Sequence, residues 1–178
     1  DEMEELLERI RRLIREIDER LKEMLKRSRE LNRELNERNK DVLRRIKELI
    51  DRIRRLIERD NDKKLVERLL EELERVIRED HKRVRKLLDE NRKLSKELED
   101  EARRLLKELE EVIDRVRRAG ADERILRELK KLVDDLRRRI KKILDESKEL
   151  LERSEKKADE SNKELRKLVE ELRKEADD

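Results

Sequence analysis

The stretch RAGADE, residues 118–123, contains the only glycine of a 178-residue chain that has no proline. Gly120 can adopt the left-handed backbone conformation that closes many α-helices. Asp122 is well suited to cap the N-terminus of a following helix, and Glu123 is favourable in the first turn of that helix. We therefore predict that one helix ends near residue 118 and that another begins near residue 122.

A second break lies at RDNDKK, residues 59–64, where three turn-forming residues follow one another. Asp60, Asn61 and Asp62 are expected to end one helix and to cap the next. The two breaks leave three segments that the sequence predicts to be helices, at about residues 2–59, 62–118 and 122–176. Each helix would be about 85 Å long at a rise of about 1.5 Å per residue.

Apolar residues recur in these segments at alternating steps of four and three, which is the heptad pattern of packed helices. In the first segment the series begins with Met3, Leu7, Ile10, Ile14, Ile17, Leu21 and Met24. One additional step of four in each segment, a stutter, is expected to relax the left-handed supercoil. Further apolar residues widen the stripe beyond what a two-stranded coiled coil needs, among them Leu6, Leu13 and Leu25.

Short loops place consecutive helices antiparallel to one another. The sequence therefore predicts an all-α fold: an antiparallel up-down-up three-helix bundle with very long helices, folded as a single domain over residues 1–178.

The composition supports long helices. Charged residues make up 60% of the chain, with 55 basic and 52 acidic residues, and hydrophobic residues make up 33%. Low hydrophobicity with high charge can indicate disorder, but here the charges nearly cancel and the apolar residues are periodic. The absence of cysteine excludes disulfides and thiolate metal sites. No apolar run approaches the roughly 18 residues of a membrane span, and the N-terminus DEMEELLERI lacks the layout of a signal peptide.

Polar residues interrupt the apolar stripe at matching heights. The stretch SRELNRELNERNK, residues 28–40, places Ser28, Asn32, Asn36 and Asn39 near positions where leucine or isoleucine would recur. Counting from the two loops, Ser28 and Asn32 face Asn91 and Ser95, and these face Ser147, with Ser154 one turn further on. By the same count Asn39 faces His81, and His81 faces Ala158, Ser161 and Asn162.

We therefore predict two adjacent polar layers whose side chains form hydrogen bonds across the core. A connected network fixes which helix faces which and in what register. Each buried polar group left without a partner would cost roughly 1–3 kcal/mol. The alternative is that some of these residues lie in water at the edge of the stripe, as expected first for Asn36. The predicted structural network consists of Ser28, Asn32, Asn39, His81, Asn91, Ser95, Ser147, Ser154, Ser161 and Asn162.

Catalytic and binding motifs are not found. His81 is the only histidine, and the Glu-x-x-His motif of di-metal bundles is absent because residue 78 is arginine. A triad of Ser161, His81 and Asp80 can be drawn, but nothing in the sequence supplies an oxyanion hole or a cleft. The densest basic cluster, residues 137–142, is flanked by carboxylates, and there are no aromatic residues for base stacking. We expect no enzyme activity, cofactor, metal, small-molecule ligand, nucleic acid or membrane partner.

Over its whole length the chain resembles computationally designed helical bundles with buried hydrogen-bond networks. The likeness consists of Leu/Ile/Val seams within Glu/Lys/Arg surfaces, the minimal loops RDND and AGAD, and the Ser/Asn/His layers. Natural spectrin-like repeats are similar in outline, but they usually carry aromatic core residues, and this chain has none. The resemblance implies a purpose of structure or assembly, no evolved activity, and no natural localisation, with a soluble product made recombinantly in a bacterial cytoplasm.

Two interpretations of that purpose stay open. In the first, the chain is a self-contained, monomeric scaffold whose polar layers specify helix pairing and register. In the second, it is an interaction module that assembles with a further helix or with copies of itself, because designed networks also select partners. The hydrophobic fraction of 33% lies nearer the roughly 29% of a strict seam than the roughly 43% of a wide face. Adding the eleven Ser, Asn and His candidates gives about 39%, which does not separate the two interpretations. We favour the first interpretation. The sequence leaves open the oligomeric state, a co-designed partner chain and the handedness of the bundle.

Overall fold

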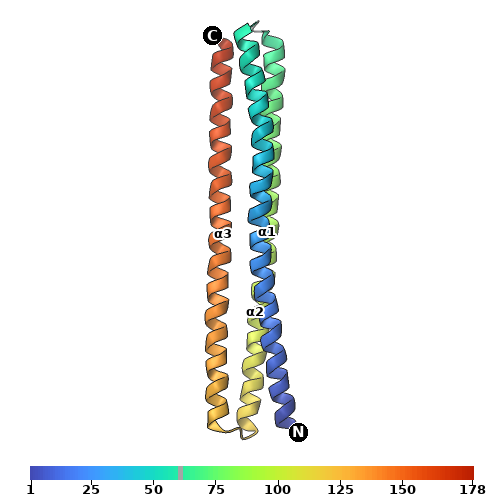
Figure 1. The fold of residues 1–178 in the computed structure, drawn as a ribbon, viewed down its shortest axis with the longest axis vertical. Helices are drawn as coiled ribbons and strands as arrows, with labels where there is room; N and C mark the ends of the chain where they lie inside the picture. Colours follow the sequence, from blue (N-terminus) through green and yellow to red (C-terminus); the bar gives the residue numbers. More distant parts are fainter. Residues whose placement is uncertain (60–61) are drawn as a thin grey trace. The chain divides into compact units, whose positions relative to one another are not determined.

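Three α-helices account for most of the chain in the computed structural model, which describes residues 1–59 and 62–178. They are α1, Glu2–Arg59; α2, Lys63–Arg118; and α3, Glu123–Asp177 (Figure 1). The described residues contain no strand, so the predicted all-α fold class is confirmed. Asp60 and Asn61, two of the three residues predicted to form the first turn, lie outside the described residues.

Capping side chains and charged residues in the terminal turns stabilise the helix ends. Asp1 precedes α1, and its carboxylate accepts a hydrogen bond from the backbone N–H of Met3 at 3.4 Å. The Asp62 carboxylate accepts from the N–H of Leu65 at 3.4 Å, so Asp62 caps α2 as predicted. Acidic residues in the first turn of α1 and basic residues in the last turn of α2 complement the helix dipoles.

The loop between α2 and α3 closes α2 with a Schellman motif. Gly120 has φ of 85°, the left-handed conformation that the sequence predicted. Its N–H donates to the carbonyl of Arg117 at 3.2 Å, and the N–H of Ala121 donates to the carbonyl of Val116 at 3.3 Å. The two bonds satisfy carbonyl groups that have no partner within the helix.

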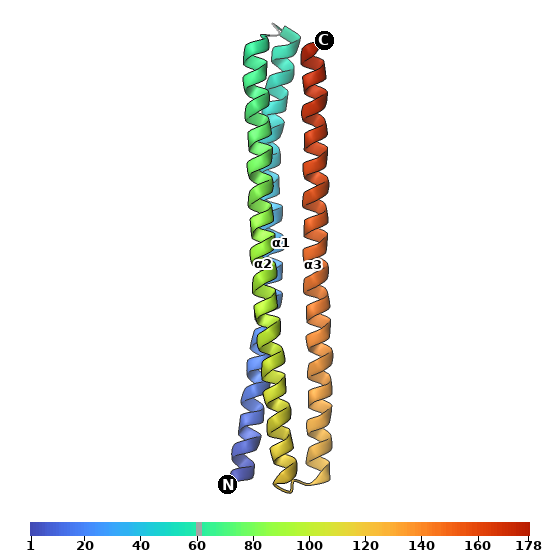
Figure 2. The ribbon, with the colours of Figure 1, turned by 180° about the vertical axis from the view of Figure 1, so that it is seen from behind.

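The chain divides into two compact units, and each contains a segment of all three helices. Unit 1 consists of Asp1–Arg29 and Asn91–Leu150, and unit 2 of Glu30–Glu90 and Leu151–Asp178. Within each unit the three segments lie side by side, with α2 antiparallel to α1 and to α3 (Figures 1 and 2). Each unit is therefore an up-down-up three-helix arrangement. The prediction of a single domain over residues 1–178 stays a prediction.

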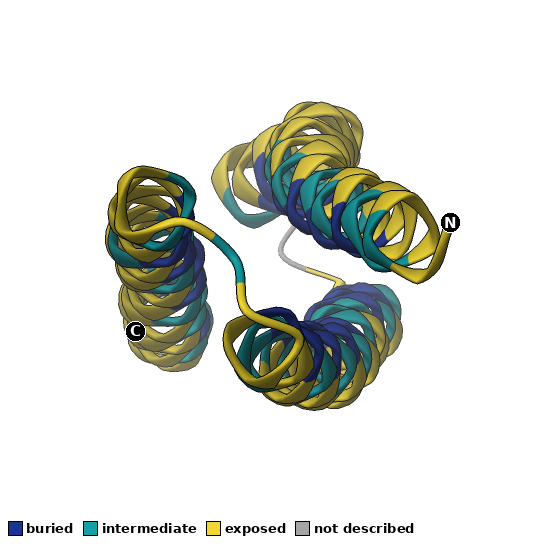
Figure 3. Cartoon of the chain, turned by 90° about the horizontal axis from the view of Figure 1, so that it is seen from below, coloured by how far each residue is buried: buried dark blue, intermediate teal, exposed yellow. Residues whose placement is uncertain are grey.

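Unit 1 has one continuous aliphatic core, in which the buried face of each segment is turned toward the other two (Figure 3). Ile17, Leu109 and Val116 in this core are fully buried. The core draws on all three helices: Ile10, Leu13, Ile17 and Leu21 from α1; Leu105, Leu109, Val112 and Val116 from α2; Leu129, Val133, Leu136 and Ile140 from α3. Since no aromatic residue is present, the packing depends on the shapes of leucine, isoleucine and valine.

Unit 2 has two separate aliphatic clusters. The larger is built around Ile53, Leu73 and Leu172, and the smaller around Leu31, Leu88 and Leu151. Between the clusters is a half-buried section, in which every residue is described and none is fully buried. This section consists of residues 32–45 of α1, 78–87 of α2 and 152–168 of α3.

We expect Gly120→Ala to lower the free energy of unfolding by about 1–2 kcal/mol, because an L-residue is strained in the left-handed conformation. Apart from Gly120 and its two chain neighbours, no atom lies within 4 Å of the position that a Cβ would take, so we expect the effect to come from the backbone. Urea denaturation followed by far-UV circular dichroism measures it. Gly120→Asn is the matched control and should lose less, since asparagine tolerates this conformation better than alanine. If both variants lost the same free energy of unfolding, the left-handed conformation assigned to Gly120 would be contradicted.

Candidate functional site: polar residues at core positions

The ten residues of the predicted network are not equally buried. Three are buried, all in unit 1: Ser28 at 2% exposure, Asn91 at 8% and Ser147 at 3%. Seven are half-buried: Ser95 in unit 1, and Asn32, Asn39, His81, Ser154, Ser161 and Asn162 in unit 2. Asn36 is exposed, as the sequence suggested.

A hydrogen bond joins two of the ten residues across the core of unit 1. The Oγ atoms of Ser28 on α1 and Ser147 on α3 are 2.9 Å apart. One hydroxyl donates to the other, and either can be the donor. The bond therefore joins α1 to α3 across the core of unit 1.

Asn91 and Asn162 each have a buried side-chain atom without a partner among the described residues. These atoms are Asn91 Nδ2 and Asn162 Oδ1. Buried atoms of Asp18 and Arg20 make no regular hydrogen bond either, but both are within ion-pair distance of an opposite charge. An unsatisfied buried amide costs roughly 1–3 kcal/mol, so Asn91 is a weak point of the unit 1 core.

The second predicted layer lies in the half-buried section of unit 2. Among the described residues, no hydrogen bond joins Asn39, His81, Ser161 and Asn162 to one another. Partial exposure lets water serve as a partner for the polar groups of Asn39, His81 and Ser161, whereas Asn162 Oδ1 is buried. A connected network that includes these residues stays a prediction.

Asp80 lies beside His81 in the half-buried section. Burial raises the pKa of its carboxyl group above the ordinary value of 3.8, and the nearby charges of Arg83, His81 and Arg38 partly offset this effect. Desolvation disfavours the charged form, whereas neighbouring positive charges favour it. No hydrogen bond connects Asp80, His81 and Ser161 within the described part of the chain, so the triad that can be drawn from the sequence is not assembled.

Arginine–carboxylate pairs join the helices of unit 1 at all three interfaces. Arg20 on α1 meets Glu101 on α2 at 2.6 Å, and Asp18 on α1 meets Arg139 on α3 at 2.9 Å. Arg137 on α3 pairs with Glu110 on α2. These pairs were not predicted from the sequence. The signal that could have found them is opposite charge at positions flanking the apolar stripe on facing helices.

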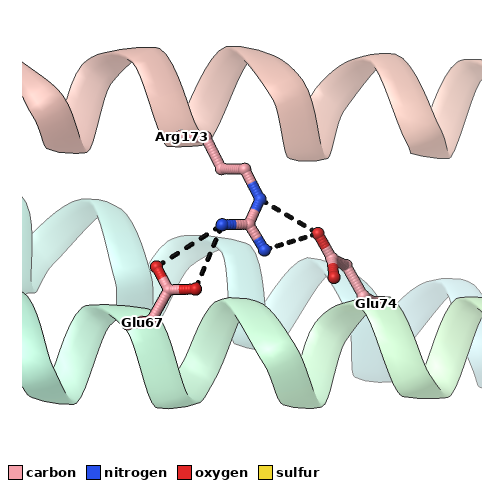
Figure 4. Close-up of polar contacts among 3 residues, drawn as sticks. All are labelled: Glu67, Glu74 and Arg173. Atoms are coloured by element: carbon pink, nitrogen blue, oxygen red, sulfur yellow. Dashed lines mark hydrogen bonds and ion pairs between the residues drawn. The ribbon is translucent and has the colours of Figure 1, made fainter.

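In unit 2, two arginines each bridge α2 and α3. Arg173 donates to Glu74 from Nε at 3.0 Å and also binds Glu67 at 3.1 Å (Figure 4). The hydrogen bonds to Glu74, and to a smaller extent those to Glu67, raise the pKa of Arg173. Arg85 binds Glu155 and Asp159, each at 2.8 Å. These side chains are substantially exposed, so each pair contributes at most about 1 kcal/mol and mainly favours one pairing of helix faces.

The described residues hold no group of three or more His, Asp and Glu side chains that could bind a metal ion. None of the described helices is long and apolar enough to cross a membrane.

No protein-family model and no curated protein matches this chain. Among solved structures, the chain is similar to a protein described as a "Computationally designed three helix bundle", with 23% sequence identity and a TM-score of 0.55. The similarity covers 99% of this chain and 87% of that chain. At this identity the likeness establishes the three-helix bundle fold alone.

The Ser28–Ser147 pair predicts a measurable coupling between α1 and α3. We expect Ser28→Ala and Ser147→Ala each to lower the free energy of unfolding by about 1–3 kcal/mol, because each strands a buried hydroxyl. The double variant should lose less than the sum, by about 0.5–1.5 kcal/mol, in a double-mutant cycle measured by urea denaturation. Asn36→Ala, at an exposed position on α1, is the control and should change stability by less than about 0.5 kcal/mol. Additive losses would show that the two hydroxyls do not interact.

Because the pKa of Asp80 is raised in the folded protein, we predict that this residue lowers the free energy of unfolding at neutral pH but not in acid. The folded state binds this proton more tightly than the unfolded chain, so ionised Asp80 opposes folding. The penalty is absent below the ordinary pKa of 3.8 and develops as pH rises through the folded pKa. Asp80→Asn should therefore have a higher urea midpoint than the parent chain at pH 7, with the difference disappearing in acid. The exposed Asp100→Asn is the control, and an equal pH-dependent gain in that variant would refute the assignment.

Proposed function

We propose that this chain is a designed structural scaffold, a self-contained three-helix bundle without catalytic activity. The single observation that carries the proposal is the buried Ser28–Ser147 pair. α1 and α2 are adjacent in sequence, as are α2 and α3, and only short connections separate them. No connection joins α1 directly to α3, so their register depends on the two loops through α2 and on side chains that pair across the core. A buried polar pair serves that purpose, because slipping the register strands both hydroxyls.

Three further features support a designed origin. Strong helix formers fill the surface, and a capping aspartate begins α2. A Schellman glycine ends α2, and the loop that follows is short. The similar solved structure is described as a computationally designed three-helix bundle, which agrees with the resemblance seen in the sequence.

The proposal extends to the remaining polar residues and to the assembly state. In it, the Ser/Asn/His layers specify helix pairing and register along the chain, which folds as one soluble, monomeric domain. It has no nucleic acid, membrane or small-molecule partner. The wide aliphatic core of unit 1 supports this interpretation, because it draws on all three helices of one chain.

Replacing one predicted layer with apolar residues tests the proposal. The variant changes Ser28, Asn32, Asn91, Ser95 and Ser147 together to aliphatic residues of suitable size. Its denaturation midpoint should equal or exceed that of the parent chain, because no polar group is left unpaired. The variant should no longer adopt a single helix register and a single assembly state, because the polar layer no longer opposes slipped registers or pairing between chains.

Light scattering coupled to size exclusion gives the deciding measurement. The parent chain should show a single mass of 22.1 kDa, and the apolar variant a mixture of masses. A matched control variant changes the same number of exposed serine, asparagine or lysine residues to alanine. A dimeric parent would contradict the monomer proposal. A variant that stays wholly monomeric with one register would contradict the role proposed for the layer.

A further inference from the structure

The α3 segment of the half-buried section is packed differently from the helix on either side of it. Its inward positions carry Ser154, Ala158 and Ser161, which are small, and no residue from 152 to 168 is fully buried. On either side α3 is anchored by Leu151 in the smaller cluster and by Val169 in the larger one. Between these anchors the inward positions from 154 to 161 are small, and Leu165 and Leu168, which pack against the larger cluster, are only half-buried.

In this section the faces of α1 and α2 that are turned toward α3 carry aliphatic residues that α3 does not fully bury. Leu35 and Val42 on α1 and Val84 and Leu87 on α2 are only half-buried, although all four belong to the stripe that faces the other helices. Leu43 on α1 is 39% exposed. A larger apolar neighbour would bury more of these half-exposed aliphatic side chains. The free energy of packing would then become more favourable in proportion to the area removed from water.

Ion pairs also join α3 to α2 in this section. Arg85 on α2 forms ion pairs with Glu155 and Asp159, which are four residues apart on α3. Exposed pairs of this kind orient a helix but stabilise it little. Segments with few buried apolar contacts open locally more readily than the core around them. We therefore expect residues 152–168 to open more readily than the neighbouring parts of α3 that contain the buried residues Leu151 and Val169.

We propose that the α1–α2 face of the half-buried section, residues 32–45 and 78–87, is a docking surface for an amphipathic helix that replaces α3 there. The guest carries large aliphatic residues where α3 has Ser154, Ala158 and Ser161. It runs antiparallel to α2 and presents two carboxylates four residues apart to Arg85. Further along, the guest helix carries an arginine at the position of Arg173, and this arginine binds Glu67 and Glu74. The inference goes beyond the scaffold proposal and does not depend on the origin of the chain.

The probe is a fluorescent peptide of residues 148–178 with the changes Ser154→Leu, Ala158→Leu and Ser161→Leu. Its affinity for the full chain is measured by fluorescence anisotropy. It should bind at least about a hundredfold more tightly than the peptide of unchanged sequence, because three larger aliphatic side chains are buried. The same leucine peptide with Glu155→Lys and Asp159→Lys should bind at least about tenfold more weakly, because it repels Arg85.

Hydrogen exchange shows whether the peptide replaces α3. Before addition, the amides of residues 152–168 should exchange at least about tenfold faster than those of residues 46–53 and 66–77. Addition of the leucine peptide should accelerate exchange at 152–168 and protect 32–45 and 78–87. A full chain that carries the three leucines itself should bind the peptide at least about tenfold more weakly, because its own α3 then competes at high effective concentration.

Three results would overturn the proposal. The first is equal affinity of the leucine and unchanged peptides. The second is binding without faster exchange at residues 152–168, which would place the peptide on an outer face. The third is a concentration-dependent mass of the chain without peptide, blocked by the leucine changes in the chain, which would assign the surface to a second copy. The five-residue replacement is judged by the mass and denaturation midpoint of the chain without peptide, whereas the docking surface is judged by peptide affinity and hydrogen exchange, so failure of either proposal is distinguishable from failure of the other.

Discussion

The burial of aliphatic side chains along one face of each helix is the constraint on which the structure depends. Helices of this length cannot be held by intrinsic propensity alone, because most helical stability in proteins comes from packing of an apolar face. Each fully buried leucine, isoleucine or valine contributes roughly 1.5–3 kcal/mol, whereas an exposed ion pair contributes at most about 1 kcal/mol. Residues such as Ile17, Leu73 and Leu109, with 0% exposure, therefore dominate the energetics.

Polar residues in this stripe have different effects in the two units. In unit 1 the Ser28 and Ser147 hydroxyls share one hydrogen bond, so a compact polar pair fits within a buried core. The amide of Asn91 is larger and has a buried donor without a partner among the described residues. In unit 2 the polar residues occupy a section in which side chains reach water, and its apolar clusters are consequently separate. The Ser28–Ser147 pair is compatible with close packing, whereas His81, Asn32, Asn39 and Asn162 lie where packing is looser.

The charged surface contributes selectivity rather than stability. Arg20, Asp18 and Arg137 each have a partner on a neighbouring helix, so all three interfaces of unit 1 carry an opposite-charge pair. In unit 2 Arg85 and Arg173 each reach two carboxylates on the facing helix. A helix placed on the wrong neighbour would set like charges against one another, which opposes that arrangement. The nearly balanced charge of the chain is thus distributed to favour particular pairings of helix faces.

The sequence by itself determined the number, limits and amphipathic faces of the helices. Gly120, Asp62 and Asp122 act over a few residues, and the heptad spacing acts within one helix, so both are readable without knowledge of the fold. The register count also placed Ser28 opposite Ser147. Only the tertiary structure decided which polar residues are buried, since that depends on the side chains that two other helices present at the same height. For the same reason the interhelical arginine pairs and the half-buried section were not evident from the sequence: each results from facing residues far apart in the chain.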